Sequence, residues 1–98
     1  MKPLNLPFVD AAKLSKQHPD TFFVPSTEEI ELVKPEEFVK VCLDEPGIGG
    51  ERFWCKVISN DQKTKLIVAE IDNHLVSYDL EVGTKVEIKY RNVYAIYQ

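Results

Sequence analysis

Four stretches of the sequence alternate apolar with polar side chains, and this period of two is the feature that most restricts the fold. Val39, Val41 and Leu43 lie on one side of an extended chain, and the residues between them lie on the other. Because side chains alternate across a β-strand, this pattern predicts a half-buried strand. The alternation recurs over residues 52–59, 65–71 and 85–90. The sequence therefore predicts a mainly β fold.

Turn-forming residues separate these stretches. A proline and three glycines within residues 44–51 predict a loop between two strands, and the polar run 60–63 predicts a tight turn. A weaker apolar run, His74–Tyr78, is interpreted as a further strand. We expect about five strands in a small, strongly bent antiparallel sheet or an SH3-like barrel. The expected core consists of Phe22, Val39, Val41, Leu43, Val57, Ile67, Ile71, Val86 and Ile88.

The N-terminal third of the chain carries helix signals. Asp10 can accept the free N–H groups at the start of a short helix over residues 10–17, and Pro19 ends that helix. Ser26 and Glu29 have the spacing of a capping box, which predicts a second short helix. Residues 1–9 contain two prolines and are interpreted as a loose N-terminal arm. The remaining residues, 10–98, are expected to form a single β-rich domain.

The charge balance weighs against nucleic acid and membrane partners. The chain has 12 basic and 16 acidic residues, a formal net charge of −4, and no apolar run long enough to span a bilayer. A field of this sign repels phosphate backbones unless the basic residues gather on one face. The excess acid lies in residues 1–50, where the acidic stretch 28–37 is interpreted as a solvated surface, with a docking surface for a basic partner as the alternative.

The two cysteines, Cys42 and Cys55, lie inside apolar runs and are interpreted as reduced core residues. Together with His18 and His74 they would number four zinc ligands, but they lack the spacing of a zinc site. We therefore expect no metal and no cofactor. The start of the chain lacks the long apolar segment of a signal peptide. These features predict a cytoplasmic protein whose partner is another cytoplasmic protein.

No constellation of residues indicates catalysis, so we expect no catalytic residues and no enzyme. Aromatic side chains interleaved with arginines point instead to binding, because such residues dominate the energy of protein interfaces. The candidate interaction surface consists of Arg52, Trp54, Tyr90, Arg91 and Tyr94. Whether Trp54 is an exposed anchor or a core residue is left open by the alternation. The favoured function is a non-enzymatic protein-binding module.

Two alternative functions stay open. Small barrels bind single-stranded nucleic acid by stacking bases on aromatic rings beside cationic side chains. This function would require a basic stripe made of Arg52, Lys56, Lys85, Lys89 and Arg91. A small cysteine-dependent hydrolase would use Cys55 with His74 and Asp72, although no nucleophile elbow or helix N-terminus activates that thiol.

Several short motifs occur in an order that resembles a known bacterial family. The motifs are His18-Pro19-Asp20-Thr21-Phe22 with Pro25, Val39-Lys40-Val41, Gly50-Glu51-Arg52-Phe53-Trp54, the turn residue Asn73, and the glycine turn and strand from Gly83 to Ile88. They resemble the family of uncharacterised proteins named domain of unknown function two-three-one-four, over residues 18–93. The resemblance implies a compact, β-rich, barrel-like module, and it implies no established catalytic residues.

Overall fold

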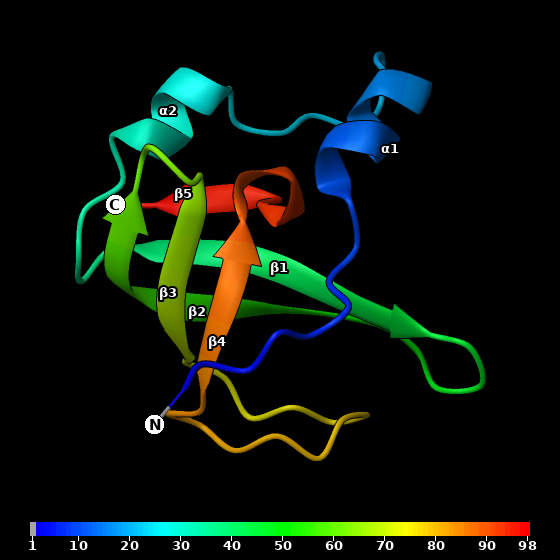
Figure 1. Cartoon of the computed structure of the whole chain (residues 1–98). Helices are drawn as coiled ribbons and strands as arrows, with labels where there is room; N and C mark the ends of the chain where they lie inside the picture. The colour runs from blue at the N-terminus through cyan, green and yellow to red at the C-terminus, as the bar shows by residue number, and fades with distance from the viewer. Residues whose placement is uncertain (1) are drawn as a thin grey trace.

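A five-stranded antiparallel sheet forms the centre of the protein (Figure 1). The computed structural model describes residues 2–98. The strands are β1 (Phe38–Glu45), β2 (Gly49–Asp61), β3 (Leu66–Ile71), β4 (Lys85–Lys89) and β5 (Ala95–Tyr97). Their order in the sheet is β4-β3-β2-β1-β5, so β4 and β5 form its two edges. The predicted mainly β fold is confirmed, as an antiparallel sheet that is not closed into a barrel.

Two short helices begin where the sequence predicts them. Helix α1 (Ala11–Gln17) is capped by Asp10, whose carboxylate accepts a hydrogen bond from the backbone N–H of Lys13 at 3.0 Å. Helix α2 (Thr27–Glu31) begins with the capping box of Ser26 and Glu29. A 3-10 turn, η1 (Tyr90–Asn92), joins β4 to β5. Both α-helices lie at the same end of the molecule in Figure 1.

The fifth strand does not lie where the sequence analysis placed it. His74–Tyr78 forms a loop, and its backbone is held by the Glu51 carboxylate, which accepts hydrogen bonds from the N–H groups of Val76 and Ser77 at 2.8 Å each. Because a side chain satisfies these donors, the segment needs no strand partner. The fifth strand is β5, which pairs with the start of β1.

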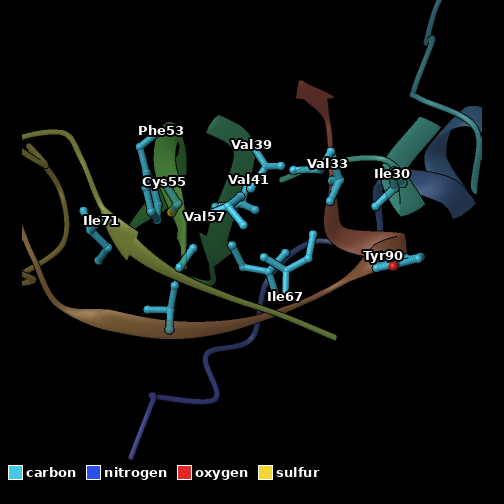
Figure 2. Packing of buried hydrophobic residues seen from close by; sticks show 14 of the residues in the cluster. Ile30, Val33, Val39, Val41, Phe53, Cys55, Val57, Ile67, Ile71 and Tyr90 are labelled. Carbon is cyan, nitrogen blue, oxygen red and sulfur yellow. The ribbon is translucent and has the colours of Figure 1, made fainter. Parts of the chain in front are cut away.

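The inward-facing strand residues pack together on one face of the sheet (Figure 2). Eight of the nine predicted core residues are at most 1% exposed. The exception is Phe22, which is half-buried in a second, smaller cluster with Ala11, Cys42 and Tyr94. Its ring meets that of Tyr94 edge-on, with 5.3 Å between the ring centroids. Phe22 therefore packs outside the main core, against α1 and the segment that precedes β5.

A β-bulge in β2 changes which of its side chains face the core. Val57 pairs with Ala69, and Ser59 pairs with Val68, the next residue back along β3. Ile58 is therefore an extra residue, and such an insertion bends the strand and shifts the alternation by one. As a result Asn60, rather than Ser59, turns inward.

Asn60 uses this position to connect three elements. Its side-chain N–H₂ group donates to the backbone carbonyls of Ile30 at 2.8 Å and Val33 at 3.0 Å, at the end of α2. Its side-chain oxygen accepts a hydrogen bond from the Tyr90 hydroxyl at 2.6 Å. A single polar side chain thus holds α2 and η1 against β2.

The N-terminal arm is attached to the sheet, in contrast to the loose segment expected from its prolines. Leu4 forms a parallel bridge with Val86 of β4, and Phe8 forms an antiparallel bridge with Leu43 of β1. The arm therefore crosses from β4 to β1, as the blue segment of Figure 1 shows. The cause is apolar burial, because Leu6 and Phe8 pack against the main core. Met1 lies outside the described residues.

Replacing Phe8 by alanine tests this attachment. Loss of a half-buried ring that contacts the core should lower the free energy of unfolding by about 2 kcal/mol. Phe23→Ala is the matched control, because the Phe23 side chain is 77% exposed and its loss should change stability by less than about 0.5 kcal/mol. Urea denaturation measures both values. Equal stability of the two variants would show that the Phe8 ring does not hold the arm on the core.

Candidate interaction surface

The face of the sheet opposite the core carries the candidate site. Arg52, Trp54 and Lys56 alternate with the buried residues of β2 and so point outward. In the pairing of β1 with β2, Lys40 lies opposite Trp54, and Phe38 lies opposite Lys56. The outer face of these two strands therefore combines aromatic and cationic side chains.

Three aromatic residues from three adjacent strands meet on this face. Phe38 pairs with Tyr97 of β5, and the two ring centroids are 6.3 Å apart. The Trp54 and Tyr97 centroids are 6.1 Å apart. Phe38 and Trp54 are half-buried, and Tyr97 is 56% exposed. We call these three residues the aromatic patch; they line a shallow pocket together with Asp72 and Asn73.

Cationic side chains lie along the aromatic patch. The Lys40 ammonium lies 4.9 Å from the centroid of the Trp54 ring, within the range of a cation–π contact. The Lys56 ammonium lies 3.7 Å from the exposed Glu36 carboxylate. The Arg52 guanidinium lies 5.0 Å from the centroid of the Tyr94 ring. We call Lys40, Arg52 and Lys56 the cationic rim.

The structure separates the five residues predicted as one interaction surface. Arg52 and Trp54 lie on the outer face of β2, and Tyr94 touches Arg52. Arg91 is exposed on η1, where its Nε lies 3.9 Å from the Asp10 carboxylate. Tyr90 belongs to the main core. The five therefore occupy three separate locations.

Tyr90 and Tyr94 are buried, which corrects the expectation that they are exposed anchors. The Tyr90 ring fills one end of the main core while its hydroxyl bonds to Asn60, and the Tyr94 ring packs in the second cluster against Phe22 and Cys42. Trp54, whose position the sequence left open, is half-buried on the outer face.

Four residues of the site were missing from the predicted surface: Phe38, Lys40, Lys56 and Tyr97. Of these, Lys56 was expected only as part of the basic stripe. The alternation within residues 38–43 does place Phe38 and Lys40 on the outward side. Their partners depend on the register between β1, β2 and β5, which alternation alone does not specify. Tyr97 lies in a strand of three residues, which is too short to show a period.

Cys55 does not have the properties of a nucleophile. The side chain faces the core and is fully buried. Burial, with a further contribution from the Asp72 carboxylate, raises the pKa of the Cys55 thiol to about 12. The thiol is therefore protonated at neutral pH, and only the thiolate attacks. His74, the base that a hydrolase would need, is exposed on the loop after β3.

Among residues 2–98, no three or more His, Cys, Asp and Glu side chains form a group that could hold a metal ion. No helix within this range has the length and apolar character needed to cross a bilayer.

Comparison with known proteins gives no relative from which a function could be inferred. No protein-family model, no curated protein and no solved structure matches this chain. Any function of this chain therefore has to be inferred from the geometry of its described residues.

Cys55 gives a testable dependence of stability on pH. Its thiol has a higher pKa in the folded chain, about 12, than the ordinary value of 9.0. The unfolded chain therefore loses this proton first, and the stabilisation present below about pH 9 is lost as the pH rises toward 12. A Cys55→Val variant should show a smaller loss of unfolding free energy between pH 8 and pH 10 than the natural chain. Equal slopes for both proteins would contradict the raised pKa.

Proposed function

We propose that this protein is a non-enzymatic binding module that holds an acidic segment of a partner protein on the aromatic patch. The observation that carries the proposal is the meeting of Phe38, Trp54 and Tyr97 on the outer face, with the Lys40 ammonium over the Trp54 ring. Aromatic side chains that are only partly buried are the usual anchors of protein interfaces. Apolar side chains of a partner would complete their burial.

The position of α1 supports a free aromatic patch. The helix packs at one part of the outer face, where Ala11, Cys42 and Tyr94 form the second cluster. Phe38, Trp54 and Tyr97 belong to neither buried cluster of the described chain. This part of the sheet is thus able to receive a partner without displacing α1.

The charge of the cationic rim selects the chemistry of that partner. Lys40 and Lys56 lie opposite Trp54 and Phe38, and Arg52 lies two residues before Trp54 on the same face. These three positive charges outnumber the one carboxylate that lines the pocket, Asp72, although the whole chain carries a net charge of −4. The Lys56–Glu36 pair is exposed, and exposed ion pairs contribute little free energy. Lys56 can therefore exchange Glu36 for a carboxylate of the partner.

Single-stranded nucleic acid is a weaker candidate because the five basic residues predicted as a stripe are not contiguous. Across the sheet, Glu70 of β3 lies between Lys56 and Lys85. Glu87 lies between Lys85 and Lys89 along β4. A phosphate backbone that followed this path would meet two carboxylates, which opposes binding.

We also propose that the protein is cytoplasmic. Cys42 and Cys55 are both free and buried, and such thiols are compatible with a reducing compartment such as a bacterial cytoplasm. We keep a cytoplasmic protein as the expected partner. Membership of the family that the sequence resembles stays a prediction.

The single tryptophan makes the proposal directly testable, because its fluorescence reports on the site alone. We expect acidic peptides that contain leucine or tyrosine to shift Trp54 emission at micromolar concentrations. Basic peptides of equal length should leave the emission unchanged. Lys40→Glu and Tyr97→Ala should each weaken peptide binding about tenfold, as expected for interface anchors. Leu32→Ala is the matched control, because Leu32 is 69% exposed at the C-terminal end of α2 and belongs to neither the patch nor the rim.

The same titration separates the alternatives. Oligothymidylate should cause no shift; a shift that weakens steeply with salt would favour nucleic acid instead. Peptide affinities that are unchanged by Lys40→Glu and Tyr97→Ala, in variants with native circular dichroism, would overturn the proposed site. The absence of any peptide-induced shift would overturn the proposed function.

A further inference from the structure

A second concave site lies between the two helices and the end of the sheet that carries η1. It is a pocket of about 550 Å³, within the size range of small-molecule sites. Its walls come from α2, from the turn between β2 and β3, and from the junction of β4 with η1. None of its lining residues belongs to the aromatic patch or the cationic rim, so any ligand here is independent of the proposed peptide site.

The polar lining of this pocket is cationic. Lys65, Lys89 and Arg91 contribute three positive charges, and Thr27 and Thr64 contribute hydroxyl groups. No acidic residue lines the pocket. Since the chain as a whole is negatively charged, this concentration of cations is a local feature. Lysine, arginine and hydroxyl donors together suit a phosphate group.

The rest of the lining is apolar and held in place. Ile30 and the ring of Tyr90 lie at one end of the main core (Figure 2), and both line the pocket. Asn60 fixes both of them, because it binds the Ile30 carbonyl and the Tyr90 hydroxyl. The pocket therefore presents a rigid apolar wall beside its cations, which suits a ligand with an apolar group as well as a charge.

Lys65, which lines this pocket, has a strained backbone conformation. Its φ angle is +57°, in the left-handed region where glycine and asparagine are favoured. Its carbonyl accepts a hydrogen bond from the Tyr90 N–H at 3.3 Å, and its ammonium lies 5.5 Å from the centroid of the Tyr90 ring. The turn would form more easily with asparagine, so a lysine here is better explained by its charge than by its backbone.

Carboxylates near the pocket would compete with a phosphate for its cationic side chains. Asp10 lies 3.9 Å from Arg91 across an exposed ion pair. Glu31 and Asp61 lie near the hydroxyl end of Tyr90, where burial first and then these charges raise the pKa of that hydroxyl. Tyr90 therefore stays neutral and keeps donating to Asn60. Among the described residues, Asp10 is the carboxylate that is paired with a cation of the pocket, and a bound phosphate has to displace it from Arg91.

We propose that this pocket binds a small organic phosphate. The phosphate contacts Lys65, Lys89 and Arg91, and the apolar group of the ligand lies against Tyr90 and Ile30. Both parts of the ligand are needed, because the cations and the apolar wall belong to the same pocket.

Phenyl phosphate is a suitable probe, with inorganic phosphate and phenol as controls that each lack one part of it. Amide NMR spectra of the full chain should show saturable shifts at Thr64–Leu66 and Lys89–Arg91. Affinity should be higher for phenyl phosphate than for either control. Lys65→Asn should weaken binding about fivefold, the effect of losing one partly exposed charged contact, and should raise the melting temperature. Lys63→Asn is the matched control, since Lys63 lies in the same turn but not in the pocket, and it should change neither.

Three results would overturn this inference. They are the absence of saturable shifts at millimolar phenyl phosphate, shifts confined to residues outside the pocket, and affinity unchanged in Lys65→Asn. If Lys65→Asn does not fold, Lys89→Gln gives the same comparison. Lys40→Glu should leave phenyl phosphate binding intact, and Lys65→Asn should leave peptide binding intact, so failure of this inference is distinguishable from failure of the proposed function.

Discussion

The pairing of β2 with both of its neighbours is the constraint on which the rest of the structure depends. This strand of 13 residues pairs with β1 on one side and β3 on the other. Its inward side chains contribute the centre of the core, including Phe53, and its outward side chains carry the candidate site. Because inward and outward side chains alternate along β2, burial of the inward ones in the core leaves the outward ones on the opposite face.

Because of the bulge at Ile58, β2 also holds α2 and η1 in place. Beyond the bulge the inward position falls on Asn60, which holds α2 and Tyr90. The aromatic patch and the cationic pocket thus both depend on β2, the first on its regular part and the second on its irregular part. The net charge of −4 predicts neither site, because the side chains at both sites are mainly cationic. Local register and bulge geometry, rather than the overall charge, decide which side chains each surface presents.

Much of the fold could be predicted because its signals are local. Alternation identified the strands of Val39, Val57, Ile67 and Val86, and side-chain caps identified both helices. The prediction was wrong where a long-range contact replaced a local one: Glu51 holds the loop that was interpreted as a strand. The candidate site was predicted only in part. Arg52 and Trp54 share a face by alternation. The burial of Tyr90 and Tyr94 depends instead on contacts with Asn60, Phe22 and Cys42, which lie far away in the sequence.

By itself the sequence determined four of the five strands, both helix starts and eight of the nine expected core residues, because period and capping act between residues close in the chain. Only the tertiary structure decided which outward residues become neighbours. Tyr97 reaches Trp54 because β5 adds to the free edge of β1, and Lys65 reaches Tyr90 because the turn after β2 meets the end of β4. Strand register and edge pairing join residues far apart in sequence, and no local pattern records them.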